Sequence, residues 1–308
     1  MDLFQLETFL AVAQERSFSR AAVRLRRTQP AVSQAIAKLE AELGEALFER
    51  SLRDGSLTVA GEILREYAQK LLNLRTEAEA ALQELRSLHR GQLNLAANEY
   101  TSLYLLPLLD VFRRQHPRIK VTVHRSLASR IADEVLAHSV ELGVLSFRPE
   151  DAQLRSIVVY RDVLALVVHP KHALARAKEV SIRDLGKEDF VAHNVPSPQR
   201  AKVLEAFRRH KTNLRIEVEL PSLDAVKRFV AMGNGVALVP GLTVERELAD
   251  KSMVQVMVKE LQMERKLRLV HRKQAVLSHA ALAFLQVVEK YAQIHGDPYS
   301  YLLEKSGA

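Results

Sequence analysis

A short stretch of the chain carries side chains that can hydrogen-bond to the edges of nucleic-acid bases. Gln29, Ser33 and Gln34 offer amide and hydroxyl groups for this purpose, and Ala37 is small enough to contact a thymine methyl group. Four apolar residues at spacings of four, three and four predict one buried helix face: Val32, Ile36, Leu39 and Leu43. At about 100° per residue, Gln34 and Ala37 then point outward, with Ser33 and Lys38 on the flanks.

Two further helices are expected to position this face. An apolar stripe at the start of the chain indicates a first helix, and Ser19 is expected to cap a second one. Thr28 is placed to cap the third helix, and Gly44 to end it. Two short helices, a turn and a third helix predict a helix-turn-helix.

The residues after this unit suit a two-stranded wing. Residues 50–57 read as two strands around an Asp-Gly turn. Arg50 and Arg53 there could contact phosphates or the minor groove. Six basic residues and no acid lie in the range 16–39, which favours a DNA-facing surface. The alternative is a packing module whose arginines only face solvent.

Residues 58–88 carry a heptad pattern. Nine residues alternate at spacings of four and three: Ala60, Leu64, Tyr67, Leu71, Leu74, Ala78, Ala81, Leu85 and Leu88. The pattern predicts one helix on the order of 45 Å long, at ~1.5 Å per residue. We expect a homodimer along this seam; the alternative is a long helix packed on its own domain.

The remaining 218 residues alternate predicted strands and helices, which is typical of an α/β region with mostly parallel sheets. A region of this length suits two lobes. The whole chain has 308 residues, 47% of them hydrophobic, and a net charge of +8 that lies entirely after residue 90. Residues 1–60 hold eight basic and eight acidic residues, so the bulk charge is a poor argument for DNA binding.

Several classes of protein are excluded or disfavoured by the composition. Cysteine is absent, which removes disulfides, thiolate metal sites and cysteine nucleophiles. No apolar run is long enough to span a bilayer, and the first residues lack a basic leader, so we expect a cytoplasmic protein without a membrane partner. Phosphate-loop, dinucleotide-binding and hydrolase motifs are also missing. An enzyme is therefore disfavoured, while a ligand-independent architectural DNA-binding protein stays open as a further alternative.

The residue pattern of the first 61 positions resembles the LysR-type transcriptional regulators. The positions that carry the resemblance are Ala22, Leu25, Thr28, Gln29, Pro30, Ala31, Val32, Ser33, Ile36, Leu39, Glu40, Leu43, Gly44, Leu47, Phe48, Arg50, Arg53, Leu57, Thr58, Ala60 and Gly61. Looser matches follow at 169–185 and 232–240. The resemblance implies a winged helix-turn-helix domain, a long linker helix, and an α/β, two-lobed, periplasmic-binding-protein-like (type 2) domain.

This resemblance implies three segments and a mode of assembly. The DNA-binding domain would span 1–58, the linker and dimerisation helix 59–90, and the effector-binding domain 91–308. Lobe I would comprise 91–163 and 267–308, and lobe II 164–266. Members of the family form homotetramers, as dimers of dimers, that read an imperfect palindrome in double-stranded DNA and can contact RNA polymerase.

The resemblance also assigns residues to DNA. Ser33 and Gln34 would lie nearest the base edges, beside Gln29 and Pro30. Thr28 would cap the recognition helix and could bond a phosphate. The flanking positions complete the expected DNA-binding set: Lys38, Arg50 and Arg53.

An effector is expected between the lobes, near the end of the first strand. Free N–H groups with hydroxyl side chains suit a small anion there, such as an organic acid or an amino acid. The expected effector-binding residues are Glu99, Tyr100, Thr101, Ser102, Ser146, Phe147, His193, Asn194, Pro221 and Ser222. Glu99 departs from this picture, because its carboxylate would repel an anion if it pointed inward; it could equally accept an amino group or face solvent. No cofactor, metal or catalytic residue is expected.

Overall fold

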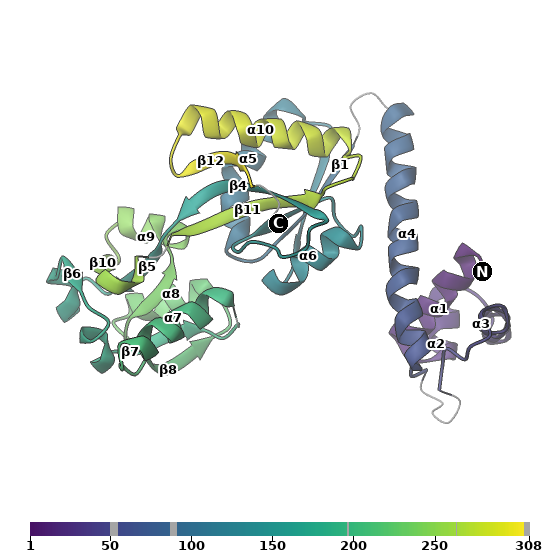
Figure 1. Ribbon diagram of the computed structural model, residues 1–308, viewed down its shortest axis with the longest axis horizontal. Coiled ribbons are helices and arrows are strands. Elements are labelled where there is room, and N and C mark those ends of the chain that lie inside the picture. The colour runs from purple at the N-terminus through teal and green to yellow at the C-terminus, as the bar shows by residue number, and fades with distance from the viewer. Residues whose placement is uncertain (50–54, 87–90, 196, 263, 305–308) are drawn as a thin grey trace. The chain divides into compact units, whose positions relative to one another are not determined.

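The structure is a computed structural model that describes residues 1–49, 55–86, 91–195, 197–262 and 264–304. The chain forms two compact units (Figure 1). The first comprises Met1–Arg86 with Ala137–Ser139, and the second comprises Ser87–Leu136 with Val140–Ala308. Within the described residues, no helix combines the length and the apolar character that crossing a membrane requires.

In the part of the first unit that the structure describes, the chain forms four helices. These are α1 (Leu3–Glu15), α2 (Phe18–Leu25), α3 (Gln29–Leu43) and α4 (Val59–Arg86). Thr28 caps α3 as predicted, because its hydroxyl accepts a hydrogen bond from the N–H of Ala31, and Gly44 ends α3 in the left-handed region. The prediction that Ser19 caps α2 is wrong. Ser17 has the extended backbone of a cap and accepts from the N–H of Arg20, whereas Ser19 lies inside the first turn.

The core of this unit is the predicted buried face of α3 packed on α1 and α2. It contains Leu6, Phe9, Leu10, Ala11, Val12, Ala21, Ala22, Val32, Ile36, Leu39, Leu47, Phe48 and Ala68. Leu43 was expected on the same face, but 40% of its surface is exposed, because it is the last residue of α3 and lies beyond the core. Gly61 brings α4 against the loop before it, since a Cβ at this position would lie 2.2 Å from the carbonyl oxygen of Leu47.

The base of the predicted wing is present. Phe48 pairs with Leu57 in an antiparallel bridge, and the N–H of Glu49 donates to the carbonyl of Ser56. Arg50, Arg53 and the Asp54 of the predicted Asp-Gly turn lie outside the described residues, whereas Gly55 is described and has a positive φ of 67°.

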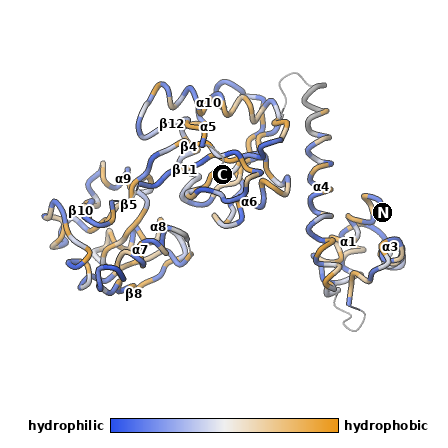
Figure 2. Tube along the Cα trace, viewed as in Figure 1, coloured by the Kyte–Doolittle hydropathy of each residue, from blue (hydrophilic) through white to orange (hydrophobic). Residues whose placement is uncertain are grey.

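Hydrophobic residues recur along the described part of α4 (Figure 2), and they form a packed set and an exposed set. One set packs on the core of the same unit: Ala60, Leu64, Ala68 and Leu72. A second set is exposed: Val59, Ile63, Tyr67, Leu71, Leu74 and Leu82. Ala60 and Leu64 therefore belong to the domain's own packing rather than to a free seam, and the exposed apolar set runs from Val59 to Leu82.

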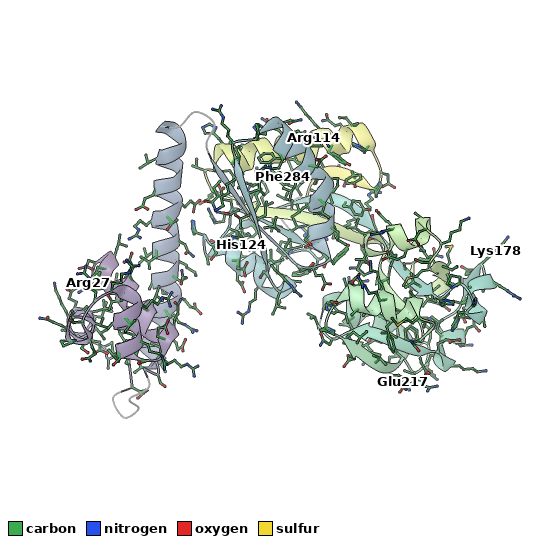
Figure 3. The ribbon with its side chains drawn as sticks, turned by 180° about the vertical axis from the view of Figure 1, so that it is seen from behind. Arg27, Arg114, His124, Lys178, Glu217 and Phe284 are labelled. Carbon is green, nitrogen blue, oxygen red and sulfur yellow. The ribbon has the colours of Figure 1, made fainter. Side chains whose placement is uncertain are left out.

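Lobe I of the second unit is a six-stranded mixed sheet in the order β12-β4-β11-β3-β1-β2. The strands are β1 (Gln92–Ala97), β2 (Lys120–Arg125), β3 (Leu142–Leu145), β4 (Leu154–Asp162), β11 (Arg265–Arg272) and β12 (Tyr299–Leu303). Helices α5 (Thr101–Gln115) and α10 (His279–His295) pack on one face, and α6 (Ala128–Leu136) packs on the other. Figure 3 shows Phe284 among the side chains that fill the α10 side.

Lobe II has a four-stranded sheet in the order β6-β10-β5-β9 and a two-stranded one, β7-β8. A bridge between Phe190 and Val236 joins them. The strands are β5 (Leu164–Val168), β6 (Glu179–Val180), β7 (Asp189–His193), β8 (Arg215–Leu220), β9 (Ala237–Pro240) and β10 (Val254–Val258). The helices are α7 (Pro198–Arg209) on one face, with α8 (Leu223–Ala231) and α9 (Glu245–Ala249) on the other.

The expectation of mostly parallel sheets is wrong. Among the described strands, β1 pairs in parallel with β2 and β3, but β11 and β12 add antiparallel pairs to the same sheet. In lobe II, β5 pairs antiparallel with both β9 and β10. The reason is topological: the chain leaves lobe I after β4 and returns with β11, so the returning strand enters the sheet in the opposite direction. Between β6 and β7 the chain forms only a short 3₁₀ turn, Asp184–Lys187.

Candidate functional site

The outward face of α3 is the first candidate site. Gln29, Pro30, Gln34 and Lys38 are exposed, and Ser33 is half-buried. They stand opposite the buried stripe that fixes the helix on the core, so the side chains are presented on a rigid support. Ala37 is exposed as well, which keeps the centre of this face low enough for close approach to a groove.

Two of these residues already interact. Nε2 of Gln29 donates a hydrogen bond to Oγ of Ser33 over 2.8 Å. The two positions are four apart, so they lie on the same side of the helix. The bond uses an acceptor site of the hydroxyl and leaves its O–H free to donate. Gln29 and Ser33 therefore form one polar unit beside Gln34.

The basic residues around α3 differ in their partners. Arg24 donates to a carboxylate oxygen of Glu15 over 3.1 Å, and Arg20 donates to the carbonyl of the same residue. Arg27 is labelled in Figure 3, and its guanidinium lies 5.6 Å from the ring centroid of Phe4. These contacts fix arginines that line the side of the helix-turn-helix, and exposed ion pairs of this kind contribute little to stability.

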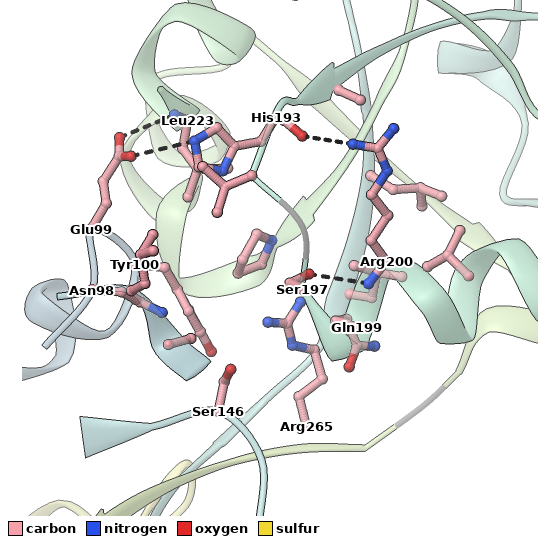
Figure 4. A pocket seen from close by; sticks show the side chains of 18 of the residues that line it. Asn98, Glu99, Tyr100, Ser146, His193, Ser197, Gln199, Arg200, Leu223 and Arg265 are labelled. Atoms are coloured by element: carbon pink, nitrogen blue, oxygen red, sulfur yellow. Dashed lines mark hydrogen bonds and ion pairs between the residues drawn. The ribbon is translucent and has the colours of Figure 1, made fainter. Parts of the chain in front are cut away.

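The second candidate site is a cavity of about 200 Å³ lined by residues of both lobes (Figure 4). Four of the ten expected effector-binding residues line it: Glu99, Tyr100, Ser146 and His193. They come from the ends of β1, β3 and β7 and from the loop before α5. Strand ends thus converge on the cavity, as the alternation of strands and helices predicts.

The other six expected residues do not line the cavity. Thr101 is buried and bonds Asn98, so it shapes the turn before α5, and Ser102 bonds the carbonyl of Glu99. Phe147 packs beside α6, and Asn194 is exposed. Pro221 accepts a hydrogen bond from His193, and Ser222 caps α8.

A buried arginine in the cavity was not expected from the sequence. Arg265 is 6% exposed, and its Nε has no hydrogen-bond partner among the described residues. Its guanidinium lies 5.0 Å from the ring centroid of Tyr100 and 3.8 Å from Oδ2 of Asp162. Its position at the start of β11 gave no sequence signal, because neighbouring basic residues such as Lys266 are ordinary surface groups.

Tyr100 and Asp162 support this arginine. The hydroxyl of Tyr100 donates to Oδ2 of Asp162 over 2.5 Å, and the N–H of Leu242 donates to Oδ1. Burial, followed by the negative charge of Asp162, raises the pKa of Tyr100 well above its ordinary value. Tyr100 therefore stays a neutral hydrogen-bond donor, and its ring offers a face to the guanidinium.

Glu99 reaches from lobe I to the start of α8 in lobe II. Its Oε1 accepts a hydrogen bond from the N–H of Leu223 over 3.0 Å, which satisfies one of the free N–H groups at that helix end. Its Oε2 is buried, lacks a hydrogen-bond partner among the described residues, and lies 3.8 Å from both Arg125 and His193. The carboxylate expected to repel an anion thus bridges the two lobes.

Arg200 forms the other side of the cavity. It donates to the carbonyl of His193 over 3.2 Å and to the carboxylate of Glu219 over 2.6 Å. Within the part of the chain that the structure describes, no group of three or more His, Asp or Glu side chains could hold a metal ion. The arrangement offers anchored charges and an apolar wall, which suits reversible binding of a small molecule.

Comparisons with known proteins agree with this architecture. The family model of the "LysR substrate binding domain" matches residues 86–293, and that of the "Bacterial regulatory helix-turn-helix protein, lysR family" matches residues 3–62. A probable RuBisCO transcriptional regulator from Synechocystis sp. is 33% identical over 302 residues, which covers 96% of this chain and 88% of that protein.

Two solved structures show the same fold. CbnR complexed with its target DNA has a TM-score of 0.70 at 22% identity and covers 94% of this chain and 99% of that chain. The Synechocystis CcmR regulatory domain in complex with 2-PG has a TM-score of 0.62 at 23% identity and covers 67% of this chain and 99% of that chain. The predicted fold class is confirmed: an N-terminal helix-turn-helix domain is followed by an α/β effector domain.

The chain belongs to the LysR family of transcriptional regulators, with an effector-binding domain after its helix-turn-helix.

Proposed function

We propose that this LysR-family regulator reads DNA through the outward face of α3 and responds to a small molecule bound between its lobes. The observation that carries the proposal is the division of α3 into two faces. Val32, Ile36 and Leu39 are buried, while Gln34 and Ala37 are exposed on the opposite side, where no acidic side chain interrupts the surface.

The physical basis is major-groove recognition. An α-helix fits the major groove, where amide and hydroxyl side chains can distinguish base pairs. Gln29, Pro30, Ser33 and Gln34 are the proposed base-facing residues. Four residues are proposed to position the domain on the backbone: Thr28, Lys38, Arg50 and Arg53. The structure of CbnR with its target DNA, a protein of the same fold, supports this mode.

The exposed stripe of α4 supports a dimer. Tyr67 is 60% exposed and Leu74 48% exposed, in a helix whose other apolar side is already packed. A second copy of the same helix would cover these residues. A two-fold dimer places two α3 helices on two half-sites, so an imperfect palindrome is the matching DNA site. We further propose a tetramer formed by two such dimers and contact with RNA polymerase.

The effector is proposed to be a small organic acid or amino acid in the inter-lobe cavity. Binding there can regulate only if the two lobe arrangements differ in affinity for it. CcmR, whose regulatory domain has this fold, was solved in complex with 2-PG, which supports effector binding by such a domain. We propose no catalytic activity, and we place the protein in the cytoplasm, where chromosomal DNA lies.

Footprinting on the DNA upstream of its own gene tests the DNA-binding role. Gln34→Ala should alter base preference, because it removes a base-reading amide. Arg53→Ala should instead weaken binding to all sequences and reduce the salt slope by about one, because it removes a phosphate contact. Unchanged protection and salt slope in both variants would refute the assignment of α3 and the wing to DNA.

A further inference from the structure

The wall that lobe II gives to the cavity is apolar. Six of its side chains come from four strand regions and α7: Leu164, Phe190, Val203, Leu214, Ile216 and Leu238. All six belong to or pack against one core cluster of lobe II. A ligand with an apolar part binds more tightly when that part covers this wall, because apolar surface is then removed from water. A small ligand made only of charged groups has no apolar surface to bury there.

The polar wall supplies one unsatisfied cationic anchor. Arg265 is more than nine-tenths buried, lines the cavity, and has no hydrogen-bond partner for its Nε. Figure 4 shows its guanidinium pointing up from the floor of the cavity, between Tyr100 and Gln199. A carboxylate matches the planar donor geometry of a guanidinium, so Arg265 is suited to hold one.

The rest of the cavity offers little further positive charge. Each of its three arginines has a carboxylate near it: Glu99 lies 3.8 Å from Arg125, Glu219 lies 2.6 Å from Arg200, and Asp162 lies 3.8 Å from Arg265. In addition, Glu99 occupies the N-terminus of α8, the position that would otherwise attract a second anionic group. The local balance opposes a dianion such as a phosphate ester.

From these three observations we infer that the cavity takes a monocarboxylate with an apolar body. The carboxylate binds Arg265, and the body lies against the apolar wall of lobe II. At roughly 30 Å³ per water, the cavity has the space of about seven waters, which suits a metabolite on the order of ten non-hydrogen atoms. The inference rests on the proposed function, since it names the ligand class of the proposed effector site.

Two classes of metabolite combine a carboxylate with an apolar body, and they differ in whether they also carry an ammonium group. An apolar amino acid adds an ammonium to the carboxylate, and the buried Oε2 of Glu99 can accept from it. A simple organic acid lacks that group. The probes are therefore 3-phenylpropanoate, L-phenylalanine and, as a compact polyanion that carries a phosphate as well as a carboxylate, 2-phosphoglycolate.

Isothermal titration of the full-length protein, up to millimolar probe, tests the inference. We expect saturable binding of 3-phenylpropanoate or L-phenylalanine, and weaker or no binding of 2-phosphoglycolate. A stronger response to 2-phosphoglycolate than to both apolar probes, or no saturable binding of either apolar probe, would overturn it.

Variants assign the binding to this cavity. Arg265→Gln should weaken the apolar probe at least about tenfold, by loss of a charge-assisted pair. Arg161→Gln, in which a half-exposed arginine outside the cavity lining is replaced, should leave the affinity unchanged. Equal affinity of Arg265→Gln and the parent protein would contradict the assigned anchor.

Two milder variants keep the test valid if Arg265→Gln does not fold. Ile216→Thr makes the apolar wall more polar and should weaken both apolar probes about fivefold. Glu99→Gln keeps an acceptor for the N–H of Leu223 but removes the charge. It should weaken L-phenylalanine, leave 3-phenylpropanoate unchanged, and improve binding of 2-phosphoglycolate; the reverse pattern would contradict the role given to Glu99.

The same preparations separate this inference from the proposed function. Binding to the DNA upstream of the protein's own gene is measured by gel shift without any probe. Intact DNA binding with failed probe titrations overturns the ligand class alone. If the parent protein showed no sequence-specific DNA binding, the proposed function itself would be refuted.

Discussion

Gln29 and Ser33 show how single residues on α3 can be organised before DNA is met. Their hydrogen bond holds the amide and the hydroxyl in a fixed relation. A side chain held in place loses less conformational entropy when it binds a base. The two residues should therefore act on DNA as a coupled pair, whereas Gln34 acts independently.

A double-mutant cycle measures this coupling. Gln29→Ala and Ser33→Ala should each weaken binding to the natural DNA site, and their effects should fail to add by about 0.5–1 kcal/mol. DNA titration by fluorescence anisotropy gives the four free energies. The control cycle of Gln29→Ala with Gln34→Ala should be additive, and additivity in both cycles would contradict a coupled pair.

His271 is a buried titratable residue in the sheet of lobe I. It is 6% exposed, and its Nδ1 lies 2.8 Å from the carbonyl oxygen of Arg272. Burial lowers the pKa of His271 below its ordinary value, and the charge of Arg155 adds to this effect. The folded protein therefore keeps this imidazole neutral at pH values where the unfolded chain protonates it.

This shift predicts a loss of stability on acidification. Below the ordinary histidine pKa of about 6.5, the unfolded state binds more protons at this site, so the free energy of unfolding falls as the pH falls. Urea denaturation at pH values from about 7 to about 5 measures this effect. The free energy of unfolding should decrease less for His271→Gln than for the parent protein as the pH is lowered. The difference between the two proteins should be at most ~1.4 kcal/mol per pH unit. The exposed His124→Gln serves as the control, and an unchanged pH dependence in His271→Gln would rule the site out.

At the scale of elements, a single carboxylate reinforces the pairing of the final strand β12 with β4. Glu304 accepts hydrogen bonds from Nε and Nη2 of Arg268 and from the hydroxyl of Ser156. Burial alone would raise the pKa of Glu304, but the bonds from Arg268 and Ser156 outweigh it and lower the pKa. The charged form of Glu304 thus fixes β12 at the edge of the lobe I sheet.

Removing this carboxylate should loosen the strand. Glu304→Ala leaves the largely buried Arg268 without its partner and should lower the free energy of unfolding by about 2–3 kcal/mol. Thermal unfolding followed by circular dichroism measures the change. As the control, Glu264→Ala removes a half-exposed carboxylate and should lower the free energy of unfolding by less than about 0.5 kcal/mol. An equal effect of the two substitutions would contradict the role of Glu304.

The elements that the sequence predicted are those with local signals. Thr28, Pro30 and Gly44 mark the bounds of α3, and the buried stripe sets its orientation. Strand β12 carried no comparable signal, because its pairing with β4 joins residues about 140 positions apart, as for Leu302 and Val158. Glu99 could be placed near the cavity by its position after β1, but its bond to Leu223 depends on how the lobes pack.

Among the cavity residues, too, those with a local sequence signal could be predicted and those placed by tertiary packing could not. Residues directly after predicted strands, such as His193 and Ser146, were identified in advance, since strand ends converge at one edge. Arg265 and Arg200 were not, because they enter from the start of a strand and from the face of a helix. In a segment rich in charged residues, the sequence alone does not indicate which arginine becomes buried.

At the scale of the whole molecule, α4 has the central role. One set of apolar residues anchors the helix to the helix-turn-helix domain, and an adjacent set that includes Tyr67, Leu71 and Leu74 stays exposed. A regulator that reads a palindrome needs two DNA-binding domains in one assembly. The exposed stripe is the surface that we propose for holding them together.

Charged residues in the stripe should break the assembly. Leu71→Glu with Leu74→Glu is expected to give monomers with sharply reduced affinity for a palindromic site, because binding of two half-sites is no longer linked. Analytical ultracentrifugation and gel shift report the two effects. Val276→Glu, at a position 93% exposed, is the matched control; a double variant that stays dimeric would contradict the proposed interface.

Because α4 is continuous from Val59 to Arg86, its length sets a rotational phase. One inserted residue would turn everything beyond it by about 100°, whereas seven would restore the angle to within about 20°. The anchoring side and the pairing side can therefore keep their relation only when the inserted length is close to a whole number of helical turns, as seven residues are. We therefore expect a regulator with such a helix to tolerate the insertion of seven residues in α4 far better than the insertion of one.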